Sequence, residues 1–242
     1  MIQLDKREPV PFSSNPFGLV YENAIKENRE NEVQIHLYTY ILNGIKIATN
    51  IYTPKTYHKS NIFPAIVIAV PNGAVKEQTA GLYAQRLAEK GYITIVSDPI
   101  FFGESEGTPR QQDIPYYRIE DIRGMIDVIS TFPKVDSKRI YGLGICGGGG
   151  YMLSASQMDK RIKKVATLSM FNTGAVRREG FQNSQVDTVL KRLHDVGDIR
   201  EKEIKEDHLI YNQNMSDMDA SIGHQLPFEM YRESYEYYVE TH

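Results

Sequence analysis

The sequence predicts an α/β fold built on a doubly wound, mostly parallel sheet. Four short runs are almost continuously apolar, as expected for strands that are covered on both faces, and they lie at residues 64–70, 92–98, 139–145 and 165–171. Segments of helical character lie between these runs, and strands that alternate with helices form a parallel sheet. A chain of 242 residues is long enough to bury a sizeable core in one domain.

An antiparallel hairpin is predicted ahead of the parallel strands. Residues 33–54 contain two runs rich in β-branched and aromatic side chains, and Asn43 and Gly44 separate the two runs. The pair Asn-Gly in this position is the strongest short-range signal for a two-residue hairpin turn. Residues 1–32 are polar and irregular, so we expect an N-terminal arm or a helix on the outside of the domain.

Two segments carry the helical period. In residues 77–91 the apolar positions fall on one helical face, and Gly91 stands where a C-terminal cap belongs. That face consists of Ala80, Tyr83, Ala84, Leu87 and Ala88. Residues 118–130 place isoleucines on one face in the same way, and Pro133 follows the predicted end of the helix. Both segments are expected to pack on the sheet.

Composition excludes several classes of partner. The chain has 28 basic and 31 acidic residues, a formal net charge of -3 and no long block of like charge. This balance argues against nucleic acid or a membrane surface as the partner and favours small, roughly neutral ligands. A single cysteine cannot form an internal disulfide, and neither a signal peptide nor an apolar run of about 20 residues is present. We expect a soluble, cytoplasmic protein that uses no metal and no cofactor.

The only cysteine lies in an unusual setting. Residues 142–151 read GLGICGGGGY and join the third predicted parallel strand to a helix. This arrangement matches the nucleophile elbow, a strained strand-to-helix turn whose serine form is G-x-S-x-G. Such a turn needs small neighbours two residues to either side of the nucleophile, here Gly144 and Gly148. The positive end of the following helix would favour the thiolate of Cys146.

Two plainer interpretations of this run stay open. A lone buried cysteine often serves as a small apolar side chain, and a glycine-rich turn between a strand and a helix can instead cradle a phosphate. However, the run lacks the Lys-Ser or Lys-Thr ending of a Walker loop. The spacing G-x-G-x-x-G, formed by Gly142, Gly144 and Gly147, lies at the third parallel strand and lacks a ribose-binding acid about 20 residues on.

Two stretches of the chain resemble a known family. Residues 71–110, which begin PNGAVKEQ and contain FFGESEG, and residues 117–156, which contain GLGICGG, resemble the dienelactone-hydrolase-like branch of the α/β-hydrolases, of the YcjY type found in bacteria. The resemblance implies an α/β-hydrolase core over residues 33–173 with a Cys or Ser nucleophile. It also implies an Asp and a His from later strands, and the hydrolysis of esters, lactones, thioesters or similar acyl compounds.

The resemblance assigns roles to particular residues. Cys146 falls on the nucleophile, and Gly147 falls on the position whose backbone N–H donates to the oxyanion. A second donor is expected from the loop after the first parallel strand, at Gly73 or Ala74. Asp98 matches a family loop beside the site, where an architectural role is expected for it.

The last part of the chain departs from the family pattern. Residues 174–242 are charge-dense and helix-prone, and we expect them to form a helical lid or insertion. Nothing in them matches the strands that carry the family's Asp and His, so the sequence predicts either a truncated form or an unorthodox base. Of the six histidines, His224 is the best-placed substitute for the general base.

Three functions are compatible with these features. The leading hypothesis is the cleavage of an ester, lactone or thioester in a small acyl substrate by attack of Cys146. The second is a binding module that keeps the pocket but has little or no turnover. The third, a redox-sensing thiol, ranks last because the chain has no second cysteine to resolve an oxidised one. Without the later strands, residues 165–171 would be an open sheet edge. We expect either that two copies associate through this edge or that the segment from residue 174 folds back over it.

Overall fold

The computed structural model describes every residue except 1, 10–13, 59–61, 213–216, 227 and 242. The chain forms two compact units, Met1–Arg177 and Arg178–His242. The sequence-based division, by contrast, separates an arm, a core and a lid after residues 32 and 173. The two units are described separately below.

The first unit is built on a seven-stranded sheet in the order β1-β2-β3-β5-β4-β6-β7. Strands β5, β4, β6 and β7 are parallel, and the other three are antiparallel to their neighbours. The strands are β1 (Asp5–Lys6), β2 (Gln34–Leu42), β3 (Ile45–Thr53), β4 (Phe63–Ala69), β5 (Ile93–Ser97), β6 (Val135–Ile145) and β7 (Ile162–Leu168). The predicted fold class, an α/β fold with a mostly parallel sheet, is confirmed.

The predicted hairpin is formed by β2 and β3. Asn43 and Gly44 have φ angles of 51° and 81°, which are the positive values that this two-residue turn requires. The described residues before Gln34 form an arm without a helix, and this arm adds the short strand β1 beside β2.

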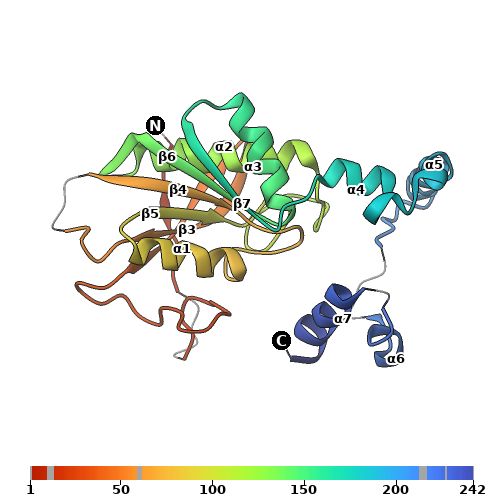
Figure 1. Cartoon of the computed structure of the whole chain (residues 1–242), viewed down its shortest axis with the longest axis horizontal. Coiled ribbons are helices and arrows are strands. Elements are labelled where there is room, and N and C mark those ends of the chain that lie inside the picture. Colours follow the sequence, from red (N-terminus) through yellow and green to blue (C-terminus); the bar gives the residue numbers. More distant parts are fainter. Residues whose placement is uncertain (1, 10–13, 59–61, 213–216, 227, 242) are drawn as a thin grey trace. The chain divides into compact units, whose positions relative to one another are not determined.

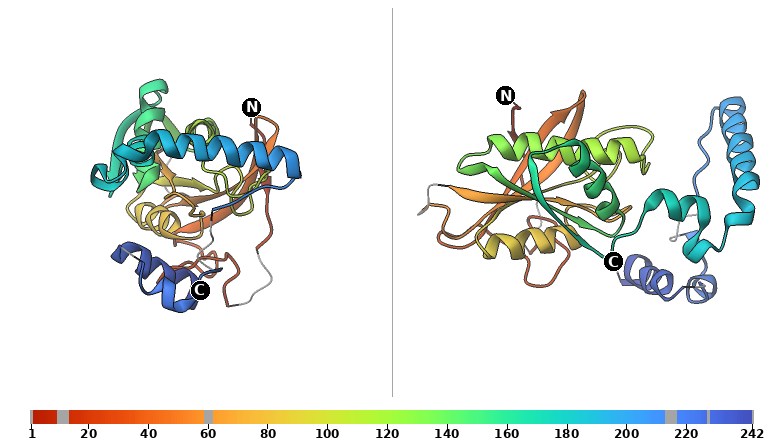
Figure 2. Two further views of the ribbon diagram at one scale, coloured as in Figure 1. Left: turned by 90° about the vertical axis from the view of Figure 1, so that its right-hand side faces the viewer. Right: turned by 45° about the horizontal axis from the view of Figure 1, so that its top comes forward.

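Helices cover both faces of the sheet (Figure 1). Helix α1 (Thr79–Glu89) packs on one face, and α2 (Pro115–Thr131) and α3 (Gly147–Met158) pack on the other. The second view in Figure 2 shows the same layers. Alternate residues of β4 point into the two cores, because successive side chains of a strand face opposite ways. The predicted face of α1 is correct except at Tyr83, which is exposed.

The order of the parallel strands creates a crevice. The chain passes from β4 through α1 to β5 on one side of β4, and then through α2 on the opposite face to β6 on the other side of β4. In open α/β sheets, ligands bind outside the carboxyl ends of the strands at such a reversal of strand order. Here those ends belong to β4 and β6, which lead into the loop at residues 70–78 and into Cys146.

The backbone of helix α3 lies directly against the backbone at the ends of β4 and β6. A Cβ atom on Gly148 would collide with the carbonyl oxygens of Val70 and Ala69, and a Cβ atom on Gly144 would lie 2.5 Å from the Cα of Gly149. Backbone cannot move aside as a flexible side chain can, so glycine is required at both positions. The expectation that the turn needs small residues on either side of Cys146 is confirmed.

Strand β7 lies at the edge of the sheet. It begins three residues earlier than predicted and ends at Leu168, because Ser169 adopts a φ of 46° that an extended strand does not tolerate. Lys163 and Lys164 at its start are exposed, and charged side chains on an edge strand hinder edge-to-edge pairing. Beyond them, Ala166 is exposed as well.

The second unit is helical wherever regular structure is described in it. Helix α4 crosses the boundary between the two units. The elements are α4 (Thr173–Glu179), η1 (Phe181–Asn183), η2 (Val186–Thr188), α5 (Val189–Glu206), α6 (Ala220–Gly223), α7 (Glu229–Tyr235) and the π-helical turn η4 (Glu236–Thr241). Within the described parts of the chain, no helix has the length and apolar character to cross a bilayer.

We predict that Gly148→Val destabilises the first unit by about 3 kcal/mol or more, because the new side chain would overlap backbone. Denaturant unfolding measures the change. Gly197→Val is the matched control, since a Cβ atom on Gly197 of α5 would meet nothing within 4 Å, and valine is the better helix former. Equal stabilities of the two variants would contradict the close approach of α3 to β4.

The self-association expected at the edge of the sheet stays a prediction. Strand β7 is the last strand of the described sheet, so the outward-facing backbone groups at this edge and the exposed Ala166 favour pairing of β7 with a second copy of the chain. Light scattering should therefore give a mass above the 27.6 kDa of one chain that falls on dilution. Ala166→Lys should shift the equilibrium toward the monomer, because a third charge on the strand repels its copy. A mass of one chain at all concentrations would contradict the prediction.

Candidate active site

Cys146 occupies the turn between β6 and α3 in a strained conformation. Its φ and ψ are 55° and -127°, a combination that residues with a Cβ rarely adopt and that costs of the order of 1–3 kcal/mol. The Cys146 N–H donates to the carbonyl of Leu168 at 2.9 Å, which ties the turn to the end of β7. Cys146 is half-buried and directly follows the carboxyl end of β6, next to the crevice between β4 and β6. These are the properties of a nucleophile elbow.

Gly147 is the first residue of α3. The first N–H groups of a helix have no partner within the helix and form its positive end, so they can receive a developing negative charge. The Asn72 side chain packs against Gly147, and a Cβ atom on Gly147 would overlap the Asn72 amide. The Asn72 Oδ1 is buried and has no hydrogen-bond partner among the described residues.

Sequence reasoning missed Asn72 because a turn explains Pro-Asn-Gly equally well. Two candidates remain for the second oxyanion donor, Gly73 and Ala74, and both lie in the loop after β4. Gly73 has a φ of +75°, and the Ala74 N–H donates to the carbonyl of Pro71 at 3.2 Å. For Gly73, no backbone hydrogen bond from its N–H is found within the described part of the chain. The geometry therefore favours Gly73 over Ala74 as a donor from this loop.

A buried arginine braces the end of β4. Arg118 of α2 is 4% exposed, and its Nη2 donates to the Val70 carbonyl at 2.7 Å. Its guanidinium lies 5.3 Å from the centre of the Tyr151 ring on α3 and forms an ion pair of 3.7 Å with Asp113. Arg118 thus links α2, α3 and β4 just behind the elbow. An arginine in a helix that already has an apolar face offers no sequence signal for this role.

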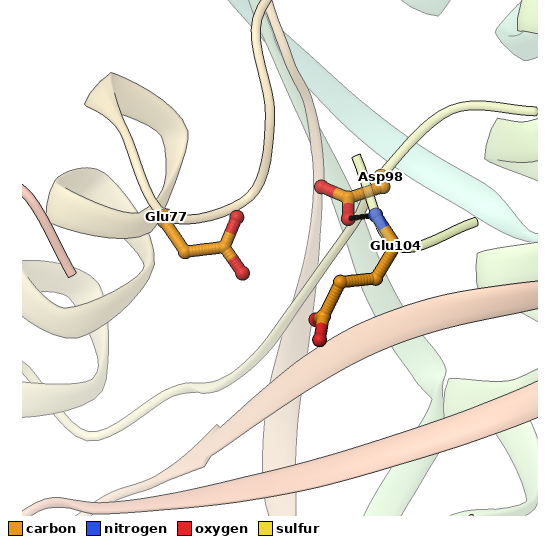
Figure 3. Close-up of side chains that lie close together, drawn as sticks. All are labelled: Glu77, Asp98 and Glu104. Carbon is orange, nitrogen blue, oxygen red and sulfur yellow. Dashed lines mark hydrogen bonds between the residues drawn. The ribbon is translucent and has the colours of Figure 1, made fainter. Parts of the chain in front are cut away.

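Three carboxylates converge next to the loop after β4 (Figure 3). Glu77, Asp98 and Glu104 each place an oxygen within 4.8 Å of the others, which is a spacing that suits a metal ion. The ammonium of Lys76 lies among them, with its Nζ 2.5 Å from Glu77, 2.7 Å from Asp98 and 2.7 Å from Glu104. Because the lysine already supplies the positive charge, the cluster is assigned to an ionic network and not to a metal.

The charged groups in this network shift one another's pKa values. Burial lowers the pKa of Lys76, but the charges of Asp98 and Glu77 outweigh burial and raise that pKa. Burial and the charge of Asp98 raise the pKa of Glu77 against the pull of Lys76. Burial acts to raise the pKa of Glu104, but the hydrogen bonds and the positive charges of Lys76 and Arg7 together outweigh burial and lower that pKa.

Neither histidine of the first unit is placed to act on Cys146. His36 lies on β2, four strands from β6, where neighbouring strands are about 4.8 Å apart. Its Nε2 bonds to Thr53 Oγ1 at 2.9 Å, and burial lowers its pKa. His58 lies in the connection that leads into β4, at the end of the sheet opposite to Cys146.

The predicted base His224 belongs to the second unit. It follows the short helix α6, and its Nε2 lies 2.8 Å from Glu240 Oε1. Its ring contacts Tyr235 at 5.6 Å between centroids. An imidazole oriented by a carboxylate is the form that a general base takes in hydrolases, and the role of His224 as the base stays a prediction.

Known proteins share the fold of the first unit and are similar to this chain in sequence. The family model described as X-Pro dipeptidyl-peptidase (S15 family) matches residues 43–221. Protein YcjY of Escherichia coli strain K12 is 46% identical over 140 residues, which cover 58% of this chain and 46% of YcjY. The structure of PA2218 from Pseudomonas aeruginosa has a TM-score of 0.76 at 34% identity, over 85% of this chain and 62% of that one.

A relative with a named activity is the thiohydrolase aneE of Aspergillus aculeatus, 30% identical over 48% of this chain and 36% of its own length. The chain thus spans less than half the length of YcjY and of aneE. The resemblance to the α/β-hydrolases that the sequence indicates is confirmed. The match over residues 43–221, on a chain with this sheet and this elbow, shows that the protein belongs to the X-Pro dipeptidyl-peptidase (S15) family of the α/β-hydrolases.

Proposed function

We propose that this chain carries the nucleophilic half of a hydrolase that cleaves an ester, lactone or thioester through Cys146. The observation that carries the proposal is the strained backbone of Cys146 at the carboxyl ends of β4 and β6. A strained conformation persists only where the surrounding structure holds it, and such sites cluster at catalytic positions. The hydrolase membership of the family agrees with this assignment.

The chemistry follows the geometry of the turn. The Cys146 sulfur attacks the acyl carbon, a carbon–sulfur bond forms, and the carbonyl oxygen gains negative charge. The N–H groups of Gly147 and Gly73 are the proposed donors to that oxygen. The bond to the leaving alcohol or thiol then breaks, and the leaving group takes the proton that the thiol has lost. Water hydrolyses the resulting acyl-cysteine, which releases the acid and restores the thiol.

Thioesters and activated esters are the favoured substrates. Their leaving groups are good, so attack by a thiolate makes smaller demands on a general acid than attack on an amide does. The similarity to a thiohydrolase supports the same class. A dipeptide amide with proline in the second position is the competing substrate that the family description suggests.

A second candidate function is a binding module with slow turnover. It is favoured by the positions of His36 and His58, neither of which is placed to serve Cys146. Without a base, acylation of the thiol could still occur, but water would hydrolyse the acyl-cysteine slowly. The two candidates therefore differ in the fate of the acyl-enzyme.

We predict that Cys146→Ala lowers the hydrolysis of p-nitrophenyl esters and acyl thioesters by at least about 10³-fold, because the nucleophile is lost. Steady-state rates over a series of acyl chain lengths measure the change, with an Ala-Pro p-nitroanilide as the amide substrate. Cys146→Ser keeps the shape of the turn and should retain part of the activity. Equal rates for the wild-type protein and Cys146→Ala would refute the proposal.

Intact-mass spectrometry separates the two candidate functions. A hydrolase should show steady turnover with little acyl-enzyme, whereas a binding module with a reactive thiol should accumulate one acyl group per chain after a single burst. Peptide mapping should place that group on Cys146. An acyl group on any other side chain would count against both candidates.

His224 is tested separately. If it is the base, His224→Ala should reduce turnover by about 10²-fold or more, because general-base catalysis contributes about 10²- to 10⁴-fold. His208→Ala is the matched control, since His208 is an exposed histidine of the same unit. Equal turnover for the two variants would contradict the role of His224 and would leave the role of Cys146 intact.

A further inference from the structure

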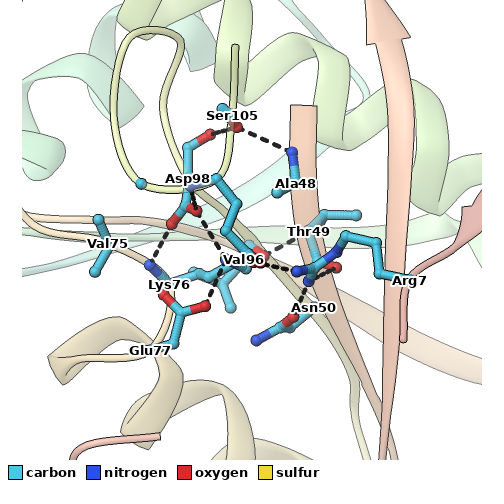
Figure 4. Close-up of polar contacts among 12 residues, drawn as sticks. Arg7, Ala48, Thr49, Asn50, Val75, Lys76, Glu77, Val96, Asp98 and Ser105 are labelled. Atoms are coloured by element: carbon cyan, nitrogen blue, oxygen red, sulfur yellow. Dashed lines mark hydrogen bonds and ion pairs between the residues drawn. The ribbon is translucent and has the colours of Figure 1, made fainter. Parts of the chain in front are cut away.

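The side chain of Asp98 connects two loops at the carboxyl ends of β4 and β5. Its Oδ1 accepts the backbone N–H of Lys76 at 2.8 Å, and its Oδ2 accepts the backbone N–H of Glu104 at 2.8 Å. The Lys76 ammonium also donates to Oδ2, at 2.7 Å. Asp98 is fully buried at the end of β5, and its single carboxylate accepts a backbone N–H from each loop in place of water (Figure 4).

The packing around Asp98 leaves no room for adjustment. A Cβ atom on Gly103 would overlap the Asp98 carboxylate, and Gly103 has a φ of +51°. The carbonyl of Asp98 accepts the hydroxyl of Ser105 at 2.8 Å, and the same hydroxyl accepts the N–H of Ala48 at 2.9 Å. The Asp98 backbone and side chain are therefore both held, and its carboxylate is a rigid anchor.

The first of the two loops is the one that faces the elbow. It carries Gly73, proposed above as an oxyanion donor, and Asn72, whose amide packs against Gly147. Two further hydrogen bonds restrain the backbone of this loop. The Ala74 N–H donates to the carbonyl of Pro71, and the Val75 N–H donates to the side chain of Gln78. The bond from Lys76 to Asp98 fastens this turn to the sheet three residues after Gly73.

A gain in folding stability does not by itself explain why this ionic network is buried. Taking a lysine and an aspartate out of water costs free energy that their mutual attraction recovers only in part, and apolar replacements of buried ion pairs are often neutral or stabilising. The ion pair nevertheless has a geometric effect that apolar side chains lack, because charge-assisted hydrogen bonds fix both distance and direction.

We propose that Asp98, together with the ammonium of Lys76, is a positioning residue that holds the loop 71–78 so that Gly73 can donate to the oxyanion formed at Cys146. This inference rests on the proposed function, because Gly73 acquires its role there. Asp98 does not touch the reacting atoms, and it acts through the backbone of Lys76. Donors held in place before the reaction stabilise the transition state more than the bound substrate, so the effect belongs in kcat.

Asp98→Asn tests the proposal, because it keeps the size of the side chain but removes its charge and one acceptor. We expect kcat for ester hydrolysis to fall about 10- to 100-fold, which is no more than the loss of an oxyanion donor causes. KM should change less than about 3-fold. Alkylation of Cys146 by iodoacetamide forms no oxyanion and should keep its wild-type rate. Amide hydrogen exchange in residues 71–78 should become faster.

Asp159→Asn is the matched control. Asp159 is also buried, accepts the backbone N–H of Arg161 at 3.0 Å and pairs with its guanidinium, but it lies after α3 at the amino end of β7. This variant should be destabilised without a selective loss of kcat. If Asp98→Asn does not fold, Glu104→Gln provides the second test, since Glu104 is half-exposed and its carboxylate bonds to Lys76 at 2.7 Å. It should cause the same changes to a smaller degree.

The outcomes distinguish this proposal from the proposed function. If the wild-type protein shows no hydrolysis that depends on Cys146, the proposed function fails, and hydrogen exchange still decides whether Asp98 holds the loop. If hydrolysis is present but alkylation falls as much as kcat, or exchange rises equally throughout the first unit, Asp98 has only a structural role and the positioning proposal is overturned.

Discussion

Direct backbone contact between α3 and the strands β4 and β6 is the constraint on which the rest of this structure depends. Gly144 and Gly148 allow the helix to begin where the two strands end, with no side chain between them. That approach accompanies the positive-φ conformation of Cys146, which stands at the carboxyl end of β6. Cys146 is also the N-cap residue of α3, so the proposed nucleophile and the positive end of the helix belong to one turn.

The polar groups around this turn are consequences of the same contact. Because α3 abuts the end of β4, the Val70 carbonyl is buried and receives the buried Arg118 as a donor. The loop that follows β4 then leaves the sheet, and the backbone N–H of its residue Lys76 is satisfied by the buried Asp98. Arg118 and Asp98 are thus buried charged groups that satisfy backbone groups next to the tight turn.

Family membership and the local geometry both point to the first unit as the location of the elbow. The match of the family model extends through most of the chain, whereas the elbow, the loop after β4 and the ionic network all lie within Met1–Arg177. The second unit contributes none of these features. In the second unit, His224 and Glu240 form a pair of their own. Under the proposed function, the first unit contains the proposed nucleophile and its proposed donors, and the base has to be identified by experiment.

The sequence by itself determined the sheet, the hairpin at Asn43 and Gly44 and the elbow at Cys146, because these depend on local patterns: continuous apolar runs, a two-residue turn and glycines at fixed spacing. It did not indicate Asn72, Arg118 or the partners of Lys76, and it placed Tyr83 on the wrong face of α1. Only the tertiary structure decided these, because the burial and pairing of a charge depend on which distant strand ends meet, and a reversal of strand order is invisible to local periodicity.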